Sequence, residues 1–366
     1  FNISVKISDL FVHAVEQELD WRLEYGGKTH KTVKAADLYH LLISNAFNHN
    51  EPGIFNADTV ERFNNGYWAF SMDRVNPCGE LVMPPYSLCC LSALNLTAFV
   101  QNPFSGKASF DWESFSRTVK TGIRFLDNIL DVTDYPLKKI EQFSRQWRRI
   151  GLGFTGLADA MCMLGIVYGE PDSLRFAEQI GIALRDHSYR TSAELAQEKG
   201  TFPACDREKL LQAAFIKTLP ENIQAMIAEN GLRNIQINTI APTGTISLSV
   251  GQNCSSGIEP IFSLQYKRKI RTGKGEETTT ETVFDYAWLL YKETYGEEAE
   301  PPPYFKTAGD IPVKQAIDMQ AVLQKYIDHS ISKTLILPRD ISLEEYKELY
   351  LYAYRQGLKG FTTFNP

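Results

Sequence analysis

Hydrophobic side chains recur along this chain with the spacing of amphipathic helices. One stripe consists of Phe115, Val119, Ile123, Leu126 and Leu130. Two more stripes have helical spacing, namely Leu10, Phe11, Ala14 and Val15 after a capping Ser8, and Leu38, Leu41, Leu42 and Phe47. Each stripe predicts a helix that turns these side chains toward the core, with no role in binding a cofactor.

Strand patterns alternate with these helices. Ile235–Ile240 alternates apolar and polar residues, as strands do. Near the end of the chain, Ser342 and Glu345 form a capping box before a helix with an apolar face of Tyr346, Leu349, Tyr350 and Ala353. Gly357 is expected to stop that helix before a strand over residues 360–364. The alternation predicts an α/β protein with substantial parallel pairing.

Three polar stretches are expected at the surface. Residues 272–282 and 296–303 are polar or proline-rich, which predicts exposed loops. Lys267-Arg268-Lys269-Ile270-Arg271 is a local basic cluster, interpreted as a solvated strand edge. A nucleotide or partner contact is the alternative interpretation of that cluster.

Length and composition agree with an enzyme outside the membrane. The 366 residues are 43% hydrophobic, enough to bury one large core or two smaller ones. No apolar run approaches the roughly 18 residues of a membrane span, and no signal peptide opens the chain, so we expect a cytoplasmic location. The net charge of −6 offers no general attraction to nucleic acid. Neither a nucleic acid nor a membrane is therefore expected as a partner.

The six cysteines lack the spacing of metal sites. They are Cys78, Cys89, Cys90, Cys162, Cys205 and Cys254, with no Cys-x-x-Cys pair. In a non-secretory context, structural disulfides and a zinc site are not expected, and no other metal site is predicted. Cys162, Cys205 and Cys254 are interpreted as buried or incidental thiols.

One pentapeptide, Asn76-Pro77-Cys78-Gly79-Glu80, carries the strongest chemical signal. Proline and glycine favour a tight loop in which the other three side chains converge. Glu80 could act as a general base for a substrate hydroxyl that Asn76 orients. A nearby carboxylate disfavours the thiolate, so Cys78 suits hydrogen-atom transfer better than nucleophilic attack. The alternative is a surface turn with an incidental cysteine.

A second candidate site follows the strand pattern of Ile235–Ile240. Its residues are Pro242, Thr243, Gly244, Thr245 and Ile246. A strand that runs into a Thr-Gly-Thr turn can direct backbone N–H groups and hydroxyls at one anion, which predicts a phosphate site. An ordinary turn is the alternative. The sequence lacks a Gly-x-x-x-x-Gly-Lys-Ser/Thr motif, so a P-loop NTPase is not supported.

Taken together, these segments resemble the ribonucleotide reductases, especially their adenosylcobalamin-dependent class. The first match is Asn76–Glu80, followed by Pro84-Pro85-Tyr86 and Cys89-x-Leu-x-x-x-Asn-Leu. The others, in the family's order around and after it, are residues 51–55, 148–159, 241–247, 256–260 and 331–334. The similarity covers nearly the whole chain.

The resemblance implies a ten-stranded α/β barrel with the Cys78 loop threaded through its middle. The chain begins at Phe1 without a methionine, in a segment that resembles the middle of the family sequence. It stops just beyond the last barrel-like strand. We therefore expect residues 1–366 to be the C-terminal portion of a catalytic barrel domain, a fragment or one half of a split enzyme, whose N-terminal portion is in the same or a separate chain.

The resemblance also implies a reaction, the reduction of ribonucleotides to 2′-deoxyribonucleotides with adenosylcobalamin as cofactor. Cys78 would carry a thiyl radical that takes hydrogen from the ribose 3′ carbon. Glu80 would accept the 3′-hydroxyl proton while Asn76 orients the ribose, and Pro242–Ile246 would hold the substrate phosphates. Cys89 would be one member of the reducing cysteine pair, and its partner would lie in the missing portion. Cys90, one residue along, is expected to pack in the core.

The resemblance implies as partners a ribonucleotide substrate, a thioredoxin-like or other thiol reductant and the missing portion of the barrel; a homodimer is also considered. An oxygen-dependent subunit that takes its radical from a separate metal-bearing subunit is one alternative. Residues 358–364 lack the adjacent tyrosines that such a subunit would use, which favours cobalamin. A non-catalytic nucleotide-phosphate-binding fragment is the other alternative; the joint presence of Asn76, Cys78, Glu80 and Cys89 argues against it.

Overall fold

The computed structural model describes residues 3–271 and 278–364, which alternate helices and strands. The α-helices are α1 (Asp9–Glu16), α2 (Ala35–His49), α3 (Ala57–Arg62), α4 (Trp112–Val132), α5 (Lys138–Trp147), α6 (Leu157–Met163), α7 (Pro171–Lys199), α8 (Arg207–Gln212), α9 (Glu221–Asn230), α10 (Gly244–Ser249), α11 (Tyr286–Tyr295), α12 (Val313–Gln324) and α13 (Leu343–Arg355). Short 3₁₀ turns cover Leu96–Phe99, Ile216–Thr218 and Ala308–Asp310. No helix of the described residues is long and apolar enough to cross a membrane.

Among the described residues, three strand pairs are parallel and five are antiparallel. They are β1 (Ser4–Ile7), β2 (Asp20–Tyr25), β3 (Lys28–Lys34), β4 (Gly53–Asn56), β5 (Arg74–Val75), β6 (Val82–Met83), β7 (Leu91–Asn95), β8 (Val100–Gln101), β9 (Ser109–Phe110), β10 (Gly151–Thr155), β11 (Gln265–Arg271), β12 (Thr278–Phe284), β13 (Thr334–Ile336) and β14 (Gly360–Phe364). One sheet has the order β1-β4-β14-β13, with an antiparallel β4–β14 pair between two parallel pairs. β7 and β10 form a second parallel pair.

Residues 235–240, predicted as a strand, form only isolated β-bridges, and these bridges link the two sheets into one row. Asn238 bridges to Leu152 of β10, and Ile240 bridges to Ile331, just before β13, both in parallel. The row therefore runs from β7 through β10 and residues 235–240 to β13, β14, β4 and β1. Gly153 permits this close pairing, because a Cβ there would lie 2.1 Å from the carbonyl oxygen of Thr239. Within the described part of the chain, closure of the row into a ring is not seen.

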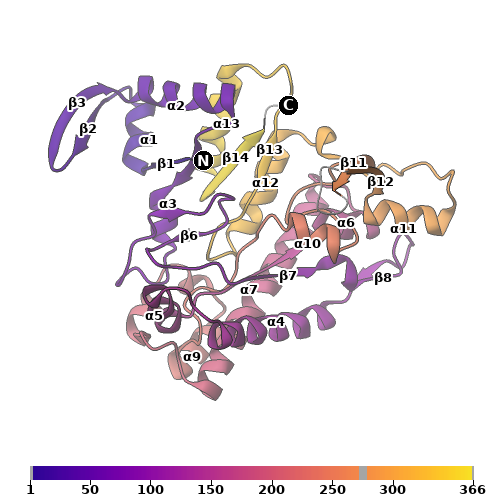
Figure 1. Ribbon diagram of the computed structural model, residues 1–366, viewed down its shortest axis with the longest axis horizontal. Helices are drawn as coiled ribbons and strands as arrows, with labels where there is room; N and C mark the ends of the chain where they lie inside the picture. Colours follow the sequence, from indigo (N-terminus) through magenta and orange to yellow (C-terminus); the bar gives the residue numbers. More distant parts are fainter. Residues whose placement is uncertain (1–2, 272–277, 365–366) are drawn as a thin grey trace.

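The helices cover this row and bury the apolar stripes that the sequence predicts. α4 packs against α7, β7 and β10, with all five residues of its predicted stripe buried. α13 begins at the predicted Ser342–Glu345 capping box and lies beside α2 and β14 (Figure 1). Its predicted apolar face is also buried, and Gly357 adopts a positive φ of 76° after the helix. The α/β class with parallel pairing is thus confirmed.

Two predicted helix faces were partly wrong. In α1, Val12 is buried instead of Leu10, which is 73% exposed. Leu10 and Val12 lie about 100° to either side of Phe11, so spacing alone did not decide between them. In α2 the buried face is Ala35, Tyr39, Ile43 and Ala46, and Leu41 is 57% exposed. The Tyr39 hydroxyl donates to the Lys347 carbonyl of α13, which fixes that rotation.

One predicted loop was also partly wrong. Residues 272–277 lie outside the described residues, and residues 278–282 belong to β12, which pairs with β11 as an antiparallel hairpin. The β-branched threonines of that polar stretch favour a strand despite their polarity. Residues 296–303 do form a loop between α11 and the next turn, and Lys267–Lys269 are exposed on β11 as predicted.

Candidate active site

Cys78 lies at the tip of the β5–β6 hairpin. The Gly79 N–H donates to the Asn76 carbonyl over 3.0 Å, and Gly79 has φ +81°, a conformation that favours glycine. The Leu81 N–H donates to the side-chain oxygen of Asn76, also over 3.0 Å. The pentapeptide therefore forms the tight loop that its proline and glycine predict, and Asn76 holds the loop together from within.

Glu80 anchors this loop to the strand row. Its backbone carbonyl accepts hydrogen bonds from the Thr239 hydroxyl at 2.7 Å and from the Ser330 N–H at 3.0 Å. The side chain is buried, and among the described residues its Oε2 has no hydrogen-bond partner. Since buried polar atoms are nearly always paired, this unpaired oxygen marks Glu80 as a candidate functional group.

The neighbouring thiols differ in exposure. Cys78 and Cys89 are exposed, whereas Cys90 lies in the core, its sulfur 3.7 Å from the Leu126 carbonyl. Burial raises the pKa of the Cys78 thiol, and the Glu80 charge raises it further. Burial and Glu80 also raise the pKa of Cys89. Both groups are therefore mainly thiols at neutral pH, and for Cys78 the sequence predicts this from the adjacent carboxylate.

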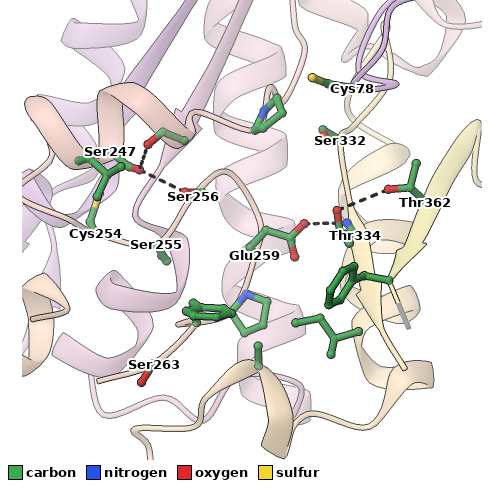
Figure 2. A pocket seen from close by; sticks show the side chains of 18 of the residues that line it. Cys78, Ser247, Cys254, Ser255, Ser256, Glu259, Ser263, Ser332, Thr334 and Thr362 are labelled. Atoms are coloured by element: carbon green, nitrogen blue, oxygen red, sulfur yellow. Dashed lines mark hydrogen bonds between the residues drawn. The ribbon is translucent and has the colours of Figure 1, made fainter. Parts of the chain in front are cut away.

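A cavity of about 720 Å³ connects the Cys78 loop with the predicted phosphate loop. Figure 2 shows Cys78 at the top of this cavity, above Ser332, with Ser247 and Ser256 on one wall and Thr334 and Thr362 on the other. The volume falls within the roughly 300–1,000 Å³ of small-molecule sites. Asn76, Glu80 and Cys89 are not among the described residues that line it.

The predicted phosphate residues take different positions. Pro242 and Gly244 line the cavity, but Gly244 also begins helix α10, so the expected turn is shorter than the sequence predicts. The Thr243 hydroxyl faces the protein, accepting from the Gly257 N–H and donating to the Thr155 hydroxyl, both at 2.9 Å. Thr245 and Ile246 are exposed outside the cavity lining.

The structure adds residues to which the sequence assigned no role. Lys333 is buried and forms an ion pair with Glu259, which lines the cavity. Glu259 also accepts from the Thr334 N–H at 2.7 Å, so it joins two cavity walls (Figure 2). Arg149 is buried and contacts the stretch between Cys78 and Cys89. These residues lie inside segments that resemble the family, and that resemblance was their only signal in the sequence.

Comparison with known proteins identifies the family of this chain. Residues 1–364 match the family described as the ribonucleotide reductase barrel domain. A vitamin B12-dependent ribonucleoside-diphosphate reductase from Mycobacterium tuberculosis is 30% identical over 100% of this chain and 52% of its own length. One from Thermoplasma acidophilum is 32% identical over 100% of this chain and 47% of its own length.

A more distant relative has a different description. The ribonucleoside-diphosphate reductase subunit alpha of Chlamydia muridarum is 26% identical over 91% of this chain and 35% of its own length. The chain spans about half the length, or less, of the curated relatives it matches. It belongs to the ribonucleotide reductase barrel-domain family, which confirms the resemblance seen in the sequence.

Proposed function

We propose that this chain forms part of the catalytic barrel of an adenosylcobalamin-dependent ribonucleotide reductase. The observation that carries the proposal is a single cavity bounded by the Cys78 loop on one side and by Pro242 and Gly244 on the other. A nucleotide whose phosphates lie at Gly244 would then present its ribose toward Cys78. The strand row would be completed to a ten-stranded barrel by a portion of the catalytic protein beyond residues 1–366.

Cys78, Glu80 and Asn76 would each have a different role in the reaction of the ribose. The Cys78 sulfur, as a thiyl radical, takes the hydrogen atom from the 3′ carbon and becomes a thiol. Glu80 accepts the 3′-hydroxyl proton through its buried Oε2. The oxygen of the Asn76 side chain is occupied by the Leu81 N–H, so its NH₂ group is the part that orients the ribose hydroxyl.

Removal of the 2′-hydroxyl as water requires two electrons and two protons. A pair of thiols supplies them and becomes a disulfide, with Cys89 as one member and a cysteine of the remaining catalytic portion as the other. A thioredoxin-like or other thiol reductant then restores the pair by disulfide exchange. Cys89 suits this role because it is exposed and because burial and the Glu80 carboxylate keep it mainly in the thiol form.

The cavity that Cys78 lines also has an apolar part. This part includes Pro260, Phe262, Ile336 and Phe364. Such a surface suits the adenosyl group of adenosylcobalamin, and these residues would hold it. When bound, adenosylcobalamin supplies the radical chemistry that protein side chains alone do not provide.

The cofactor requirement tests the proposal against the oxygen-dependent alternative. With the full-length protein, deoxyribonucleotide formation should require adenosylcobalamin, proceed without oxygen and need no metal-bearing subunit. The measurement is product yield with and without each addition. Activity restored by a diiron or dimanganese subunit without cobalamin would assign the chain to the other class, and nucleotide binding without any reduction would favour the non-catalytic alternative.

The phosphate loop gives a second test. Gly244→Val should greatly weaken nucleotide binding, because the added side chain meets no protein atom within 4 Å of its Cβ and instead enters the cavity. Thr245→Ala is the matched control: it should cost at most about 0.5–1.5 kcal/mol, the value of one hydrogen bond. Nucleotide affinity and thermal unfolding are measured for both variants. Unchanged affinity in Gly244→Val would place the phosphate site elsewhere.

A further inference from the structure

Arg149 lies at the centre of a buried polar network beside the two exposed thiols. Its guanidinium donates to the Val82 carbonyl at 3.0 Å, to the Ser87 hydroxyl and to the Gln236 side chain at 2.7 Å. Val82 follows the Cys78 loop, and Ser87 lies two residues before Cys89. One guanidinium therefore holds both ends of the stretch that connects the two thiols.

The fourth partner of Arg149 links this network to Glu80. The His329 ring lies with Nε2 3.0 Å from the Ile150 carbonyl, which can only accept, so Nε2 carries the hydrogen. Nδ1 then accepts from Arg149 at 3.2 Å. Burial and the Arg149 charge hold the pKa of His329 well below its usual range, so the ring is neutral. The next residue, Ser330, holds the Glu80 carbonyl.

The charge of Arg149 favours the thiolate of Cys89. Burial, Glu80 and Cys78 raise the pKa of Cys89, and Arg149 lowers it. The causes that raise the pKa of Cys78 are burial and Glu80. Among the described residues, no carboxylate is hydrogen-bonded to Arg149; its nearest compensation is the more distant charge of Asp328, and burial lowers its own pKa to about 10.

We propose that Arg149 is a positioning residue that fixes the stretch between Cys78 and Cys89 through Val82 and Ser87 and places a positive charge at Ser87, two residues before Cys89. By fixing this stretch, Arg149 keeps the sulfur atoms of Cys78 and Cys89 in constant positions relative to the substrate. Its positive charge stabilises the thiolate that Cys89 becomes during disulfide exchange. The role in turnover rests on the proposed function. The electrostatic coupling of Arg149 to Cys89 does not depend on the proposed function and can be measured without nucleotide reduction.

Thiol alkylation in the full-length protein tests the coupling. Only the thiolate reacts, so the rate of iodoacetamide modification at pH 8 reports the pKa of each cysteine. Cys89 is followed in a Cys78→Ser background and Cys78 in a Cys89→Ser background, with the modified residue identified by mass spectrometry. Arg149→Gln should slow Cys89 alkylation about three- to tenfold and leave Cys78 unchanged. Unfolding of the hairpin would instead accelerate both reactions.

Arg149→Lys tests the geometry of the guanidinium. It loses the planar set of donors, and burial should lower the pKa of a lysine at this position, as it lowers that of the buried Lys359 to about 7. Cys89 alkylation should therefore slow in this variant too, and deoxyribonucleotide formation should fall at least about tenfold. This variant also decides the matter if thermal unfolding shows that Arg149→Gln does not fold. A folded Arg149→Gln protein with parental Cys89 reactivity, or an Arg149→Lys protein with parental turnover, would overturn the proposal. A parent protein without reductase activity but with the expected alkylation pattern would reject only the proposed function.

Discussion

Replacement of Cys78 by serine should abolish deoxyribonucleotide formation while nucleotide binding survives. A serine O–H bond is much stronger than a cysteine S–H bond, so the loop cannot form the equivalent oxygen radical. The loop itself should persist, because it is held by the Asn76 carbonyl and side chain and by the Glu80 carbonyl, none of which involves the sulfur. The measurements are product yield and nucleotide affinity in the full-length protein.

Cys205→Ser is a matched control for Cys78→Ser, because Cys205 is a partly buried thiol that is not among the described residues lining the cavity at Cys78. It should retain most of the parent's activity. Substantial turnover by Cys78→Ser would remove the radical role from this residue. Loss of nucleotide binding in the same variant would show instead that the loop had changed shape.

The second large effect separates two adjacent cysteines. Cys89→Ser should lose multiple-turnover reduction with a dithiol reductant, because the oxidised pair can no longer form or be regenerated. Cys90→Ser should keep most of its activity, since Cys90 lies in the core and burial raises its pKa to about 11. Cys90→Ser should instead lower the thermal unfolding temperature, because it places a hydroxyl in the core. The comparison uses product formed per enzyme over many turnovers, and equal losses in both variants would contradict the assignment of Cys89.

Local patterns predicted the parts of the fold that depend on local rules. α4 carries a complete apolar stripe, and α13 begins at a capping box whose two hydrogen bonds both form. The tight loop at Cys78 follows from its proline and glycine in the same way. The exposed Leu10 and Leu41 show the limit of such rules, because which side of a helix faces the core depends on what packs against it. Residues 278–282 were wrongly predicted as a loop because their polarity was given more weight than their strand propensity.

Residues 235–240 show a different limit. Their alternation of apolar and polar residues suggests a strand with one solvated face, yet all six are buried. The polar members support the site instead: Gln236 accepts from Arg149, and Thr239 donates to the Glu80 carbonyl. Arg149 itself contacts residues 67 and 180 positions away along the chain. Contacts over such separations leave no local pattern, so the support of the Cys78 loop could not be predicted from the sequence.

The central claim is that the Cys78 sulfur removes the hydrogen atom from the ribose 3′ carbon. The most direct measurement is the rate of reduction by the full-length enzyme, with adenosylcobalamin and without oxygen, of a ribonucleotide deuterated at that carbon, compared with the unlabelled substrate. We predict slower turnover of the deuterated nucleotide by the parent and no product from either substrate by Cys78→Ser. Deoxyribonucleotide formation by Cys78→Ser would contradict the account.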